Sequence, residues 1–197
     1  MKQLPRILIF SRLFFGILII ALACFHKNSL IIIFLFTGFL TDILDGIIAR
    51  KLNSSTIRLR RMDSAVDQLF WLCALAAACI TAPQFFKYNL VKLFFILGLE
   101  LSAYIICYLR FRKEVSTHSL LSKLWVIFLL LALTQIFHIG NSEIIFETCF
   151  YLGIISRIEI IAIIFTLREW TSDVPSLYHA IQLRRGKEIK RNKLFNG

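Results

Sequence analysis

Four carboxylates stand close together in a chain that is otherwise strongly apolar: Asp42, Asp45, Asp63 and Asp67. Asp42 and Asp45 are separated by two residues, and Asp63 and Asp67 by three, so each pair shares one face of a helix. Carboxylates are costly near lipid, and those that are kept there usually bind an ion or take part in chemistry. Two helices that each present two carboxylates therefore predict a site for divalent metal ions.

The composition indicates which kind of helix carries these pairs. The chain has 197 residues, of which 58% are hydrophobic, and a mean hydropathy of +0.74, which is too apolar for an ordinary soluble domain. Its cysteines lie in apolar runs without a C-x-x-C pair, so neither a disulfide framework nor a zinc site is expected. We also expect no cleavable signal peptide, because no small-residue cleavage pattern follows the first apolar run.

Six stretches are long enough to cross a bilayer as helices, which takes about 20 residues each. They lie near residues 7–25, 29–49, 63–82, 90–111, 120–139 and 144–167. The sequence thus predicts an all-α integral membrane protein with six transmembrane helices. We expect one domain over residues 1–170 and a basic cytoplasmic tail over residues 171–197, with a role at the membrane surface.

The charges orient the predicted bundle. Basic residues gather at the N-terminus, after the second and fourth stretches and in the tail, whereas the opposite side has Lys27 and Lys87. By the positive-inside rule, both termini are cytoplasmic, and the protein is expected in the inner membrane if it is bacterial. The formal net charge of +11 then favours anionic lipid headgroups and phosphate-bearing substrates, and no nucleic acid is expected as a partner.

Both carboxylate pairs fall at one level near the cytoplasmic side, at a rise of about 1.5 Å per residue. Arg12 and Lys123 lie at similar depth on the first and fifth stretches. Gly46 and Ala49 lie on the same side as the second stretch's aspartates and allow close approach of a nucleotide or a helix, while Arg50 is placed to bind a phosphate. Two metal ions held by the carboxylates could clamp a pyrophosphate and leave one carboxylate free to accept a proton.

This segment resembles the CDP-alcohol phosphotransferase family, whose signature is D-x2-D-G-x2-A-R-x8-G-x3-D-x3-D. The chain matches it at every fixed position except the second glycine, where Leu59 stands. The matching residues are Asp42, Asp45, Gly46, Ala49, Arg50, Asp63 and Asp67. The resemblance also includes the six spans, so it extends over residues 5–167.

The resemblance implies a Mg²⁺- or Mn²⁺-dependent transfer, with two ions, from a CDP-alcohol such as CDP-diacylglycerol to the hydroxyl of an acceptor alcohol, releasing CMP. It implies that the aspartates are metal ligands and that Asp67 is also the general base. Gly46 and Ala49 would border the cytidine site, with Arg50 beside them. It also implies a homodimer. Leu59 must point away from the nucleotide or reshape its pocket.

The acceptor is less defined. The segment from Asp63 to Gln68 lacks the proline and lysine associated with phosphatidylglycerophosphate synthases, which weakens glycerol 3-phosphate as the acceptor. Activities of the phosphatidylglycerophosphate synthase or phosphatidylinositol synthase type both remain open. Candidates for binding the acceptor or a phosphate are Arg12, Arg110 and Lys123.

Other interpretations fit less well. Membrane prenyltransferases also hold a pyrophosphate with aspartates and Mg²⁺, but they are longer and have more closely clustered aspartates. A divalent-cation transporter needs polar groups along the whole crossing, and a catalytically inactive protein has little physical reason to keep the aspartate spacing. Elsewhere, we expect a structural ion pair between Arg157 and Glu100, because lone buried charges are costly.

Overall fold

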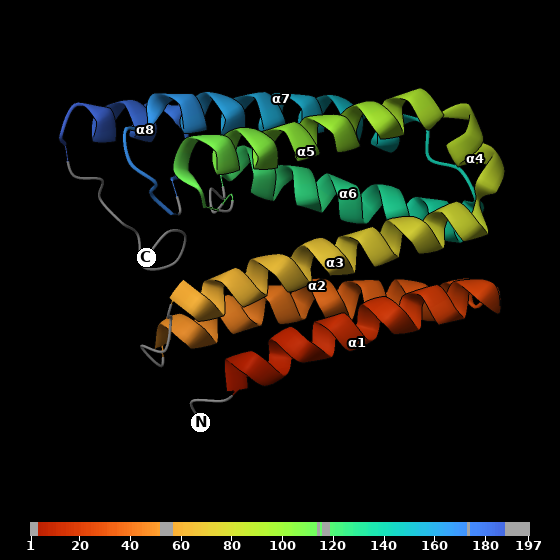
Figure 1. Ribbon diagram of the computed structural model, residues 1–197. Helices are drawn as coiled ribbons and strands as arrows, with labels where there is room; N and C mark the ends of the chain where they lie inside the picture. The colour runs from red at the N-terminus through yellow and green to blue at the C-terminus, as the bar shows by residue number, and fades with distance from the viewer. Residues whose placement is uncertain (1–3, 52–56, 114, 116–118, 173, 188–197) are drawn as a thin grey trace. The chain divides into compact units, whose positions relative to one another are not determined.

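The computed structural model describes residues 4–51, 57–113, 115, 119–172 and 174–187, without the side chains of residues 4–6, 49–51, 57, 58, 60 and 61. The regular elements of this part are α-helices (Figure 1). They are α1 (Leu4–Cys24), α2 (Asn28–Lys51), α3 (Ile57–Thr81), α4 (Pro83–Tyr88), α5 (Leu90–Phe111), α6 (Leu120–Ile139), α7 (Ile144–Thr166) and α8 (Leu177–Arg184).

Within these residues, six helices are long and apolar enough to cross a membrane. Their apolar segments are Ile7–Cys24, Asn28–Ile48, Met62–Thr81, Leu90–Phe111, Leu120–Ile139 and Ile144–Thr166. This confirms the predicted all-α fold with six spans. The sequence did not predict helices α4 and α8. Both are too short to be recognised by the long apolar run that marks a membrane span.

The chain divides into two compact units. The first comprises residues 1–88 and 130–142, and the second comprises residues 89–129 and 143–197. The four aspartates of the signature all belong to the first unit.

In the first unit, α1 packs along both α2 and α3 (Figure 1). Glycines allow the helices to approach closely. A Cβ atom on Gly16 would lie 3.3 Å from Cβ of Cys73, and one on Gly38 would collide with the ring of Phe70, which is fully buried. The opposite side of α1 exposes a stripe of large apolar side chains at helical spacing, as expected of a surface that faces lipid: Ile7, Phe10, Phe14 and Ile17.

In the second unit, α5 packs along α7, and α8 packs on the end of α7. Nε of Arg157 lies 2.7 Å from Oε2 of Glu100, which confirms the predicted ion pair. The guanidinium carbon of Arg157 also lies 4.4 Å from the centre of the Trp125 ring. A buried charge is thus paired and covered by an aromatic face.

Candidate metal centre

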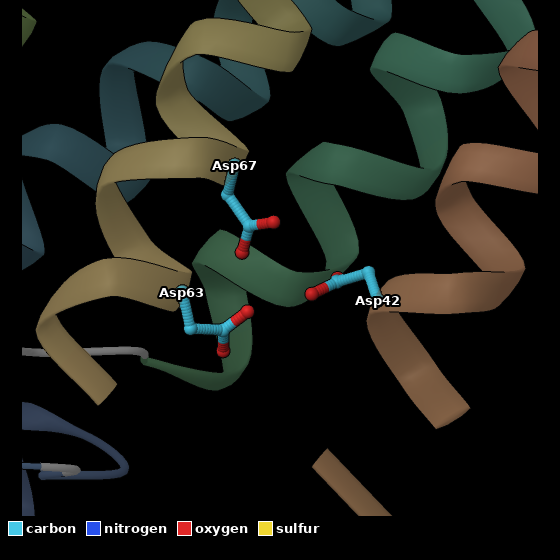
Figure 2. A group of neighbouring side chains, drawn as sticks. All are labelled: Asp42, Asp63 and Asp67. Carbon is cyan, nitrogen blue, oxygen red and sulfur yellow. The ribbon is translucent and has the colours of Figure 1, made fainter. Parts of the chain in front are cut away.

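Three of the four signature aspartates meet between α2 and α3. Oxygen atoms of Asp42, Asp63 and Asp67 all lie within 4.8 Å of one another. Figure 2 shows the three carboxylates directed toward one another, Asp42 from α2 and the other two from α3. Helical spacing places Asp63 and Asp67 one turn apart on the same face of α3, so both can face α2.

Asp45 is held differently from the other three. Its side chain is only 3% exposed, whereas those of Asp42, Asp63 and Asp67 are 35%, 31% and 24% exposed. The Asp45 carboxylate pairs with Nη2 of Arg12. The predicted set of four carboxylates is therefore arranged, in this structure, as a group of three and a more deeply buried fourth.

Arg12 of α1 connects the two parts of this arrangement. Its Nη1 atom lies 3.1 Å from Oδ1 of Asp42 and 3.2 Å from Oδ1 of Asp63, and it also contacts Oδ1 of Asp67. The whole side chain is 1% exposed. One guanidinium thus contacts all four carboxylates. The spacing of the aspartates along α2 and α3 could not reveal this contact. The sequence did place Arg12 at the same depth as the aspartates, and that depth was a signal for the contact.

Apolar packing fixes the position of Arg12 between the helices. Ile9 of α1 and Leu59 and Val66 of α3 form one buried cluster, and Leu13 packs against it. Ile9 and Leu13 lie within one turn of Arg12, and Val66 precedes Asp67. Leu59, which stands at the second glycine of the signature, is therefore directed into the packing of α1 against α3.

The remaining predicted site residues are distributed over both units. Gly46 follows Asp45 on α2 and is half-buried, whereas the side chains of Ala49 and Arg50 lie outside the described part of the structure. Arg110 and Lys123 belong to the second unit. Their proximity to the aspartates stays a prediction.

Arg110 makes a hydrogen bond that gives it a structural role. Its Nη2 atom donates a hydrogen bond of 3.0 Å to the carbonyl oxygen of Leu167, the residue that ends α7. A cation is favourable at this position, because the carbonyl groups at a helix C-terminus carry partial negative charge. Lys123 is an exposed residue of α6.

The donor set fits a hard divalent cation. Carboxylate oxygens are the ligands that Mg²⁺ and Mn²⁺ prefer, and three of them converge here from two helices. Among the side chains that the structure describes, four carboxylates outweigh the one guanidinium that contacts them all, so these five groups together carry a net negative charge when ionised. The residues present can therefore hold a metal ion.

Comparison with known families gives the same interpretation as this geometry. The family model for CDP-alcohol phosphatidyltransferase matches residues 2–167, whereas comparisons with curated proteins and with solved structures gave no match. The family consists of membrane transferases of phospholipid biosynthesis, which are generally metal-dependent and transfer a phosphatidyl group from a CDP-alcohol. The match includes all six spans and the acidic group, and the chain belongs to the CDP-alcohol phosphatidyltransferase family.

Proposed function

We propose that the protein transfers the phosphatidyl group of CDP-diacylglycerol to the hydroxyl of an acceptor alcohol and releases CMP. The observation that supports this most directly is the convergence of Asp42, Asp63 and Asp67 within 4.8 Å, in a chain of this family. Carboxylates so placed are suited to hold a divalent cation next to a pyrophosphate.

The reaction assigns a role to each part of the centre. An acceptor oxygen forms a bond to the lipid-linked phosphorus, the bond from that phosphorus to the CMP oxygen breaks, and the hydroxyl proton passes to Asp67. Asp42, Asp45, Asp63 and Asp67 are the proposed ligands of Mg²⁺ or Mn²⁺, with two ions expected. When bound, the ions neutralise the charge that develops on the leaving phosphate.

Residues around the carboxylates would bind the two substrates. Gly46 and Ala49 leave room for the cytidine moiety, and Arg50 supplies donors for a phosphate. Arg110 and Lys123 are candidates for a phosphate of the acceptor. We further propose that this centre faces the cytoplasm, where CDP-alcohols and polar acceptors meet, and that the protein acts as a homodimer.

The test is an acceptor screen with purified protein in lipid nanodiscs. CDP-diacylglycerol and Mg²⁺ or Mn²⁺ are supplied with glycerol 3-phosphate, inositol, inositol phosphate, serine or phosphatidylglycerol, and CMP release is measured. We expect release with one acceptor class, abolished by EDTA and restored by the metal. Matching lipid product identified by mass spectrometry separates transfer from simple hydrolysis.

Asp42→Asn is the site variant for this screen, and Asp173→Asn is its control. Asp173 is the chain's one aspartate outside the signature, so its substitution makes the same chemical change elsewhere. We expect the first variant to lose CMP release and the second to retain it. Absence of CMP release by the wild type with every acceptor and both metals would contradict the proposed function.

A further inference from the structure

Arg12 occupies the place at which a metal ion is expected. Its Nη1 atom contacts oxygen atoms of Asp42, Asp63 and Asp67, and these are the three carboxylates that meet as one group. A divalent cation such as Mg²⁺ coordinates carboxylate oxygens at about 2.0–2.1 Å. An ion at that distance from the same three oxygens would lie against the Nη1 amino group.

Sterics and electrostatics both oppose simultaneous occupation. Nη1 and the ion would compete for the same oxygen lone pairs, and two positive charges in contact repel strongly beside a guanidinium whose side chain is buried. The guanidinium also has a second attachment, because its Nη2 atom pairs with the deeply buried Asp45. One amino group can thus leave the group of three while the other stays bound.

We propose that Arg12 is the counter-ion of the metal-free centre and that an entering divalent cation displaces its Nη1 group from Asp42, Asp63 and Asp67. Arg12 thereby lowers the affinity for metal and stabilises the metal-free protein, in which the carboxylates would otherwise repel one another. The Asp45 contact keeps the displaced side chain at the edge of the site. This inference rests on the proposed function only for the identity of the metal ligands.

Metal affinity, measured directly, tests the proposal. Full-length protein in nanodiscs is stripped of metal, and binding of Mn²⁺ is followed by the loss of its free-ion EPR signal. We expect Arg12→Gln to bind Mn²⁺ at least about tenfold more tightly than the wild type, because a close like charge has been removed. Arg12→Lys keeps the charge, so its affinity should lie near that of the wild type.

A matched control separates this local effect from a general change in charge. Arg112 ends α5 at an exposed position, and Arg112→Gln removes the same charge from it. We expect its Mn²⁺ affinity to stay within about twofold of the wild-type value, because exposed charges are screened by salt and solvent. Equal tightening in both glutamine variants would overturn the specific role of Arg12.

Thermal unfolding gives a second readout. Without metal, Arg12→Gln should melt at a lower temperature than the wild type, and saturating Mn²⁺ should raise its melting temperature more than it raises that of the wild type. If the variant folds only with metal, it can be purified in Mg²⁺ and exchanged into Mn²⁺, and that requirement itself supports the proposal. Equal melting temperatures for wild type and variant without metal would contradict it.

Failure of this inference can be distinguished from failure of the proposed function. Weaker Mn²⁺ binding by Arg12→Gln, together with Mn²⁺-dependent CMP release by the wild type, would mean that Arg12 orients the ligands instead of competing with the ion. The proposed function would then stand. A wild type that neither binds Mn²⁺ nor releases CMP would overturn both.

Discussion

Asp67 is the residue on which the chemistry of the proposed transfer depends most directly. Its carboxylate contacts Nη1 of Arg12, so the acceptor hydroxyl would have to compete with a guanidinium for the same oxygen. Displacement of Nη1 by a metal ion would leave an oxygen of Asp67 available to accept a proton. The proposed displacement would therefore link loading of the metal to activation of the proposed base through one contact.

Asp67→Asn should lower kcat far more than it raises the KM for CDP-diacylglycerol. An amide cannot accept the hydroxyl proton, and general-base catalysis contributes about 10²–10⁴-fold to a rate. The measurement is steady-state CMP release at saturating metal, with Asp173→Asn as the control. A kcat within about threefold of the wild type would exclude Asp67 as the base, since a lost general base costs far more.

Leu59 occupies the position of a signature glycine. Its substitution tests whether the leucine stabilises the helix packing or obstructs nucleotide binding. Because its side chain packs with Ile9 and Val66, Leu59→Gly should lower both the melting temperature and CMP release. Truncation of a buried leucine costs about 2–5 kcal/mol even when it is only to alanine.

Leu69→Ala is the control for this prediction, since Leu69 lies on the same helix and is 48% exposed. We expect Leu69→Ala to change the melting temperature only slightly. Higher CMP release by Leu59→Gly than by the wild type would instead mark the leucine as an obstacle in the nucleotide pocket.

At the scale of residues, the sequence predicted which carboxylates could meet. It did not predict that Asp45 would lie apart from the other three. Helical spacing placed Asp63 and Asp67 on one face, and the structure brings them to Asp42. The separation of Asp45 depends on where a side chain from a third helix enters, and spacing within α2 carries no information on that. The sequence made Arg12 a candidate for binding a phosphate. Its contact with four carboxylates could be recognised only from the packing of α1 against α2 and α3.

At the scale of the helices, the separation of the two aspartate pairs is set by a glycine. Gly38 of α2 lies one turn before Asp42, and the Phe70 ring of α3 occupies the space that a side chain at position 38 would need. Phe70 lies one turn beyond Asp67. The contact between Gly38 and Phe70 therefore fixes how closely the two helices approach beside the proposed metal ligands.

Gly38→Ala should push α2 away from α3 and weaken Mn²⁺ binding by about tenfold or more. Overpacking of this kind costs about 1–3 kcal/mol, so the melting temperature should fall as well. Phe70→Leu, which shortens the obstructing side chain, should partly restore both properties in the double variant.

Gly98→Ala provides a matched control in α5, where a Cβ atom would meet no atom within 4 Å. It should leave Mn²⁺ binding unchanged and, if anything, stabilise the helix, because alanine has the higher helix propensity. Equal Mn²⁺ affinities in Gly38→Ala and Gly98→Ala would show that helix separation does not control the site.

The long helices could be predicted well because a span must be both long and apolar. The predicted stretch 90–111 coincides with α5, and 120–139 coincides with α6. Prediction was weaker where polar sequence continues a helix: α3 begins at Ile57, in a basic segment ahead of the predicted start at residue 63. Hydropathy locates the part of a helix that lies in lipid, whereas hydrogen bonding continues it beyond the interface.

At the scale of the whole molecule, each unit contains a buried arginine with acidic partners. Arg12 is surrounded by four carboxylates, whereas Arg157 pairs with Glu100 and lies against Trp125. The second arrangement balances one charge with one charge, as a structural pair requires. Within the described side chains, the first leaves an excess of negative charge, which is the property expected of a site that takes up cations.

The orientation of this acidic site in the membrane can be tested with cysteines. The chain's basic residues gather at the ends of the spans that are expected nearest the aspartates, and the positive-inside rule predicts that those ends, with both termini, lie in the cytoplasm. Cys24 is exposed at the opposite end of α1. In a variant whose other cysteines are replaced, a membrane-impermeant maleimide should label Cys24 in intact spheroplasts.

The companion variant lacks all native cysteines and carries Lys187→Cys, an exposed position just after α8. It should be labelled only after the membrane is permeabilised. Labelling of the Lys187→Cys variant in intact spheroplasts, without labelling of Cys24 in the first variant, would reverse the orientation and place the acidic site on the outer face. That result would separate the site from cytoplasmic nucleotides, so the cytoplasmic transfer reaction requires the first pattern.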